Sequence, residues 1–189
     1  MSIILASASP RRKQLLEQVG CKFSVITSDV NEDNQLSMPP HQLAVYHARA
    51  KASAVAGLAG RNDVVIGADT IVVVDGQVFG KPNDDFTARQ MLTKLAGRSH
   101  FVITGLAVVG NGRVWTDFAR TEVTIQELTA AQIDRYIATG EPLDKAGAYA
   151  IQGLGALLVE RIEGCYTNVV GLPLSNLARL LTKAGIELL

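Results

Sequence analysis

The segment from Val64 to Val74 reads VVIGADTIVVV and constrains the fold more than any other part of the chain. Its two halves, 64–68 and 70–74, are nearly continuous runs of apolar, mostly β-branched side chains, which is typical of central strands covered on both faces. One carboxylate, Asp69, lies between the halves. The segment therefore predicts a buried sheet built around an acid that needs a partner or an exposed break between two strands.

Helical and strand patterns alternate along the rest of the chain. Asn111-Gly112 lies between the segments 100–109 and 113–125, which we expect to pair as antiparallel strands, and is the strongest short hairpin signal; Asp75-Gly76 predicts a second hairpin. Thr129 and Gln132 have the spacing of a capping box. We expect helices at 10–19, 41–56, 84–95, 130–139 and 173–184, and further strands at 3–6, 22–27 and 156–162. This alternation predicts one α/β domain over 1–189, a mixed sheet with flanking helices.

Composition excludes several classes of protein. The 18 basic and 18 acidic residues cancel, so no broad field attracts nucleic acid or an anionic membrane, and any phosphate site must be local. The apolar start is too short for a signal peptide, which predicts a cytoplasmic location. Cys21 and Cys165 form no CxxC pair, and we interpret both as reduced structural thiols.

The first candidate site is the segment Ser7-Ala8-Ser9-Pro10-Arg11-Arg12-Lys13. It places two hydroxyl groups and three cations where a strand is followed by a helix, with Ser9 as the expected N-cap. Free N–H groups at a helix N-terminus favour phosphate, and arginine adds bidentate donors. The alternative is a capped surface helix with solvated charges. Basic residues near a helix start oppose the helix dipole, and a bound polyphosphate would explain them.

Acids and one lysine form the second and third candidates. Asp69, preceded by Gly67-Ala68 and followed by Thr70, is either functional or a turn residue between two strands. Glu32, with Asp29 and Asp33, lies in the long polar loop 28–40, where a divalent ion that binds polyphosphate finds the one or two carboxylates it needs. Solvated loop acids are the alternative. Lys81 in the Gly80-Lys81-Pro82 turn either holds a phosphate or is simply exposed.

The fourth candidate is the glycine-rich segment 144–153, DKAGAYAIQG. Gln152 can donate and accept hydrogen bonds, as a pyrimidine edge with N3–H beside a carbonyl requires. The alternative is a loop anchored by Tyr149. His41, His47 and His100 belong to different elements, and we interpret each as structural or surface.

Five motifs together resemble the Maf family of nucleotide pyrophosphatases, in order and over essentially the whole chain. They are LASASPRR at 5–12, GADT at 67–70, GKP at 80–82, DKAGAYAIQG at 144–153 and NVVGLPL at 168–174. The resemblance implies a three-layer mixed sheet with flanking helices, like that of inosine triphosphate pyrophosphatases, and commonly a homodimer. It also implies hydrolysis of a nucleoside triphosphate to the monophosphate and pyrophosphate.

The resemblance also assigns roles to residues. Asp69 matches the proton acceptor that activates water, and Glu32 with Asp69 matches the ligands of a divalent cation, Mg²⁺ or Mn²⁺. Basic positions that hold phosphates match Arg12, Lys51 and the catalytic Lys81, and Ser7 and Ser9 match substrate-binding hydroxyls. Asn31 departs from the pattern, because many relatives have a second acid beside the glutamate.

The base specificity implied by the resemblance is that of the dTTP/UTP branch. Arg11, Thr70 and Gln152 fall where that branch has its specificity residues, whereas the 7-methyl-GTP branch has glutamate near Gln152. Two alternatives stay open: the same chemistry on 7-methyl-GTP or another non-standard nucleotide, and a non-catalytic nucleotide-binding regulator of cell division and septum formation.

Overall fold

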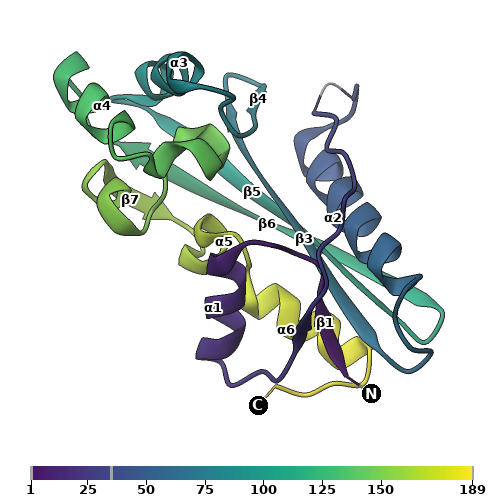
Figure 1. Ribbon diagram of the computed structural model, residues 1–189. Helices are drawn as coiled ribbons and strands as arrows, with labels where there is room; N and C mark the ends of the chain where they lie inside the picture. Colours follow the sequence, from purple (N-terminus) through teal and green to yellow (C-terminus); the bar gives the residue numbers. More distant parts are fainter. Residues whose placement is uncertain (1, 35, 189) are drawn as a thin grey trace. The chain divides into compact units, whose positions relative to one another are not determined.

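The computed structural model describes residues 2–34 and 36–188; Gln35, in the predicted loop 28–40, lies outside the described residues. Figure 1 shows the elements. The strands are β1 (Ile3–Leu5), β2 (Ser24–Val25), β3 (Val64–Val74), β4 (Gln77–Phe79), β5 (Ser99–Gly110), β6 (Arg113–Ile125) and β7 (Val159–Glu163). The helices are α1 (Pro10–Gln18), α2 (Pro40–Ala56), α3 (Asp85–Leu95), α4 (Ala130–Ile137), α5 (Tyr166–Val170) and α6 (Leu174–Lys183), with 3-10 turns η1 (Glu141–Asp144), η2 (Ala146–Ala148) and η3 (Gly153–Leu157).

The described strands form one seven-stranded sheet in the order β2-β1-β3-β5-β6-β7, with β4 paired to β3. β1 is parallel to both β2 and β3, whereas β3 and β4, and β6 and β7, are antiparallel. The sheet is therefore mixed, which confirms the predicted α/β fold class. The two hairpin turns have the predicted left-handed residues, with φ of 49° and 76° at Asp75 and Gly76 and 52° and 72° at Asn111 and Gly112.

The chain divides into two compact units. The first contains residues 1–70, 104–119 and 171–189, and the second contains residues 71–103 and 120–170. The prediction of a single domain over 1–189 stays a prediction.

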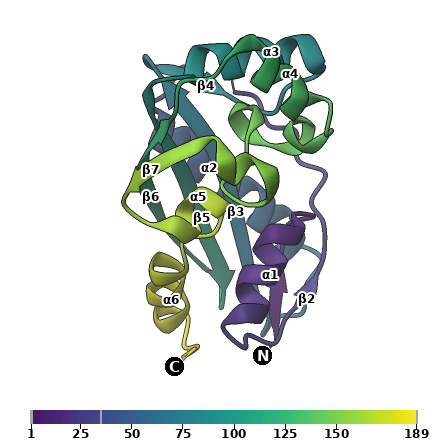
Figure 2. The ribbon, with the colours of Figure 1, turned by 90° about the vertical axis from the view of Figure 1, so that its left-hand side faces the viewer.

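In the first unit, side chains alternate along β3 between two faces of the sheet. Val65 packs with Ala48, Ala52 and Val55 of α2, and in Figures 1 and 2 α2 lies on one face of the strands while α1 lies on the other. Because successive residues of a strand point to opposite faces, Asp69 shares the α2 face with Val65, and Thr70 points to the α1 face.

Glycine lets α2 lie unusually close to the sheet. A Cβ atom at Gly67 would overlap the Ala48 carbonyl oxygen and come within 2.8 Å of Ala52 Cβ, and one at Gly105 would overlap the Ala44 carbonyl group. Only a residue without a side chain permits such an approach of two backbones. This close packing determines how far Lys51 of α2 lies from the sheet, and so the distance between its ammonium group and Asp69.

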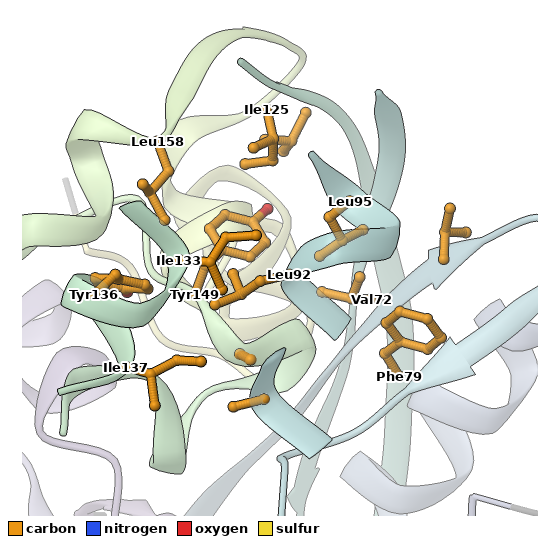
Figure 3. Packing of buried hydrophobic residues seen from close by; sticks show 14 of the residues in the cluster. Val72, Phe79, Leu92, Leu95, Ile125, Ile133, Tyr136, Ile137, Tyr149 and Leu158 are labelled. Atoms are coloured by element: carbon orange, nitrogen blue, oxygen red, sulfur yellow. The ribbon is translucent and has the colours of Figure 1, made fainter. Parts of the chain in front are cut away.

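The second unit has its own apolar core. α3 and α4 pack there with residues of β3 to β6 and with the segment around Tyr149 (Figure 3), and the core includes Val72, Leu92, Ile133 and Tyr149. α4 begins at the predicted capping box, in which Thr129 and Gln132 each bond the other's backbone. The 141–155 segment is thus attached to a packed scaffold.

Several predicted boundaries were wrong. Segments 64–68 and 70–74 form one continuous strand, so Asp69 lies inside β3 and not at a break. The strand predicted at 22–27 shortens to Ser24–Val25, and the last strand begins at Val159 instead of 156. The segment 141–155 contains 3-10 turns that were not predicted, and neither was the short helix α5. None of the helices in the described ranges is long and apolar enough to cross a membrane.

Candidate active site

Arg12 is the centre of a hydrogen-bond network at the start of α1. Its Nε donates to the Gly171 carbonyl (2.8 Å), its Nη1 to Ser7 Oγ (3.0 Å) and its Nη2 to Thr70 Oγ1 (3.0 Å). A guanidinium has five N–H donors, and the donors not used in these bonds are available to an anion. The network therefore fixes one cation in a single orientation beside the sheet.

The surroundings of Arg12 are both buried and charged. Burial lowers its pKa, while the nearby carboxylates of Asp69 and Glu32 act in the opposite direction and Arg11 adds to the lowering. Arginine still stays protonated at neutral pH, so the site has a permanent positive charge. A phosphate group would replace the solvation that this guanidinium has lost.

Asp69, Lys51 and Glu32 form an ionic cluster on the α2 face of the sheet. Lys51 Nζ lies 2.6 Å from Asp69 Oδ1 and 2.6 Å from Glu32 Oε1. Asp69 is only 3% exposed and Lys51 8%, whereas the Glu32 side chain is 38% exposed. The ammonium group therefore bridges a buried carboxylate and one that reaches solvent.

The donor set of this cluster fits a divalent cation. The second oxygen of Asp69, Oδ2, is buried and has no hydrogen-bond partner among the described residues. Glu32 and Asp69 both hold one ammonium nitrogen, so their oxygens are close enough to share a cation. Across residues 2–34 and 36–188 no group of three His, Cys, Asp or Glu side chains could hold a metal. Two carboxylates suffice for Mg²⁺ or Mn²⁺, because these ions keep several waters and take substrate phosphates as ligands.

The second unit brings two other motifs together. The N–H of Gly147 donates to the carbonyl of Gly80 (3.0 Å), which joins the turn containing Lys81 to the segment containing Gln152. Lys81 is exposed and Gln152 is half-buried. Their predicted roles remain predictions, and the two residues belong to a different compact unit from Asp69 and Arg12.

Tyr149 anchors the 144–153 segment, which agrees with the alternative interpretation of this motif as a loop anchored by Tyr149. The Tyr149 side chain is 5% exposed, and its hydroxyl lies 2.7 Å from His100 Nε2. Burial lowers the pKa of His100 to about 4 and raises the pKa of Tyr149. Both rings are therefore neutral at physiological pH, and His100 is a structural residue, as expected.

The other predicted site residues have mixed outcomes. Ser9 takes the N-cap position of α1, but its side chain makes no capping bond; its N–H donates to Ser7 Oγ instead. Arg11 is half-buried, and Asp29 and Asp33 are exposed. Cys21 and Cys165 are free thiols, as predicted.

Sequence reasoning missed three residues that hold candidate site residues in place within the two units. Gly171 was part of a recognised motif, but its role in holding Arg12 was not foreseen; its φ is 119°, and a Cβ there would lie 3.3 Å from Thr70 Oγ1. Thr104 is fully buried and its hydroxyl lies 2.9 Å from Thr70 Oγ1. Glu141, before the fourth motif, bonds the backbone that follows Gln152. Of the three, only Thr104 could have been noticed in the sequence, because it is a polar residue inside an apolar run.

Comparison with known proteins gives one family and many relatives. The model of the family described as Maf-like protein matches residues 2–184. The chain is 51% identical to the dTTP/UTP pyrophosphatase of Moorella thermoacetica over 98% of this chain and 96% of the relative. It is 48% identical to the protein of that name from Dictyoglomus thermophilum (99% and 98% covered) and 43% identical to that of Caldicellulosiruptor saccharolyticus (99% and 96%).

Two solved structures are more distantly similar. They are a dITP/XTP pyrophosphatase of Mycobacterium abscessus (17% identity, TM-score 0.40, 66% of this chain and 73% of that one) and the Ham1 protein of Staphylococcus aureus (16%, 0.45, 66% and 72%). These likenesses are too weak to bear on the fold.

Proposed function

Because the chain belongs to the Maf family, we propose that it hydrolyses dTTP and UTP to the nucleoside monophosphate and pyrophosphate. Relatives named for this activity are 43–51% identical to it over nearly its whole length. The observation that carries the proposal is Asp69, a buried carboxylate with one oxygen held by Lys51 and the other without a hydrogen-bond partner among the described residues. A proton acceptor needs an oxygen that is held in place and is not already used by another hydrogen-bond donor.

The proposed chemistry assigns Asp69 the proton of the attacking water. Lys51 fixes the carboxylate through Oδ1, so Oδ2 can take the proton as the water oxygen approaches the α phosphorus. Asp69 and Glu32 would hold a Mg²⁺ or Mn²⁺ ion, which would supply charge neutralisation and lower the pKa of water. The phosphorus–oxygen bond to the β phosphate breaks, and the electron pair leaves on pyrophosphate.

Arg12 is the proposed anchor for the phosphates. Its three bonds to Ser7, Thr70 and Gly171 hold the guanidinium in place before substrate arrives, and preorganised charge stabilises a transition state without reorganisation. In the same proposal, Ser9 and Lys81 bind phosphate, and Arg11, Thr70 and Gln152 read the base. The chain acts in the cytoplasm as a homodimer.

Replacement of Asp69 by asparagine tests the assignment. Asp69→Asn keeps the shape and a hydrogen-bond acceptor for Lys51 but removes the basic oxygen, so we expect kcat for UTP to fall roughly 100-fold or more with nucleotide binding largely retained. Pyrophosphate release with Mg²⁺ or Mn²⁺ measures turnover, and calorimetry measures binding. Asp134→Asn, at an exposed ion pair of α4, is the matched control and should behave like wild type.

Two results would contradict the proposal. Full pyrophosphate release by Asp69→Asn would remove the role of the base. Absence of release from every nucleoside triphosphate in a panel that includes dTTP, UTP and 7-methyl-GTP would instead favour a nucleotide-binding regulator.

A further inference from the structure

One carboxylate holds the backbone that follows Gln152. Glu141 Oε1 accepts from the N–H of Gly155 (2.9 Å), and Oε2 accepts from the N–H of Leu154 (3.0 Å). The hydroxyl of Tyr136 donates to the same Oε1 (2.9 Å). All three donors point at one side chain of η1, which is separated from Gln152 by residues 142–151 of the chain.

The tyrosine also holds the backbone that precedes Gln152. The N–H of Ala150 donates to the Tyr136 hydroxyl (3.3 Å). Tyr136 is 5% exposed and packs into the core of the second unit from α4. The segment on either side of Gln152 is therefore tied, through a single Tyr136–Glu141 pair, to a capped helix.

The glycines of this segment fit the pair closely. A Cβ at Gly153 would come within 2.6 Å of Glu141 Oε2, and one at Gly155 within 2.5 Å of the Tyr136 hydroxyl. Gly153 also has φ of 66°, in the left-handed region that glycine adopts without strain. No side chain fits between the backbone at these glycines and the Tyr136–Glu141 pair. The backbone after Gln152 is therefore held at a fixed distance from the pair.

The ionisation of the pair agrees with this geometry. Burial acts to raise the pKa of Glu141, but the Gly155 and Leu154 N–H groups and the Tyr136 hydroxyl outweigh it, and the pKa is lowered. Burial, together with Glu141, raises the pKa of Tyr136. Near neutral pH the pair is a carboxylate that accepts and a phenol that donates.

We propose that Tyr136 and Glu141 are positioning residues for base selectivity, because they hold the backbone on both sides of Gln152 and so fix the direction in which its amide meets a pyrimidine. This inference rests on the proposed function. Neither residue touches the substrate. An amide that must donate to one base atom and accept from its neighbour discriminates only when it is held in one orientation.

A double-mutant cycle tests the proposal. Glu141→Gln leaves the volume unchanged but turns an NH₂ group toward a backbone N–H, so we expect KM for UTP to rise about tenfold with kcat altered less than about threefold. The preference for UTP over GTP, as a ratio of kcat/KM, should shrink by a similar factor. In a Gln152→Ala background the same change should have no further effect, because the amide that it positions is gone.

Tyr136→Phe and Glu163→Gln complete the experiment. Tyr136→Phe retains the ring packing, loses only the hydroxyl and should shift KM in the same direction, so it carries the test if Glu141→Gln fails to fold. Glu163→Gln, at an exposed pair with Arg161 in the same unit, loses the same charge and should match wild type.

The outcomes separate this proposal from the proposed function. An active wild type, with Glu141→Gln lowering kcat/KM equally for UTP and GTP or equally in both Gln152 backgrounds, would overturn the positioning role alone. A wild type that releases no pyrophosphate from any pyrimidine triphosphate would overturn the proposed function, and this inference with it.

Discussion

The two compact units hold their candidate site residues by different means. In the first unit, charged side chains bond one another: Lys51 joins Asp69 to Glu32, and Arg12 is fixed by two hydroxyls and a carbonyl. In the second, Tyr136 and Glu141 accept hydrogen bonds from backbone N–H groups on both sides of Gln152, and Tyr149 is held through its hydroxyl by the neutral His100. The first arrangement preorganises charge, as transition-state stabilisation requires, and the second preorganises shape, as selectivity requires.

Removal of the central cation should have the largest effect and would test whether charge pairing holds the first unit together. Lys51→Met leaves Asp69 buried without its partner and facing Glu32, so the free energy of unfolding should fall by about 3–5 kcal/mol. Urea denaturation measures the change. Lys94→Met, which removes an exposed ammonium that lies over the Phe79 ring, is the control. A loss below about 1 kcal/mol for Lys51→Met would show that the ionic cluster is not structural.

A test of backbone packing sharpens the comparison, because it perturbs the first unit without changing its charge. Gly67→Ala forces a methyl group into the Ala48 carbonyl and Ala52, so we expect a loss of about 3 kcal/mol and a displaced α2. Gly57→Ala is the matched control: its φ is −65° and the nearest atom is 3.5 Å away. The urea midpoints of the two variants are compared. Equal midpoints would contradict the close approach of α2 to the sheet at Gly67.

Acid titration should show that the second unit depends on neutral groups. The pKa of His100 is lowered to about 4 in the fold, from an ordinary value near 6.5, so between these values the unfolded chain binds a proton that the native chain does not. The contribution of His100 to the free energy of unfolding is therefore fully present above about pH 6.5, and it falls by up to about 3 kcal/mol as the pH drops toward 4. His100→Gln accepts from Tyr149 without titrating and should flatten this part of the curve. Parallel curves for variant and wild type would refute the assignment.

Local patterns in the sequence predicted the fold class, the hairpins and the capping box, because each depends on residues close together in the chain. They also identified Asp69 as an acid that needs a partner. They did not identify Lys51 as that partner from geometry, since the pairing depends on how closely α2 approaches the sheet. The continuity of β3 was missed because an aspartate interrupts an apolar pattern even where a lysine neutralises it.

The segment around Gln152 shows where sequence reasoning ends. Its glycines and Tyr149 were visible as a motif, but Tyr136 and Glu141 bond backbone N–H groups, and a backbone donor leaves no trace in residue identity. Such bonds follow from the path of a loop and are found only in three dimensions. The same holds for Gly171, whose contribution to Arg12 is a carbonyl oxygen.

The ammonium of Lys51, between two carboxylates, bears on whether the site needs a bound ion before it can form. Opposed negative charges would otherwise repel one another until an ion arrived from solution. With a counter-charge built into α2, the two carboxylates are held together by the protein itself. Under the proposed function, the metal would then arrive with the nucleotide.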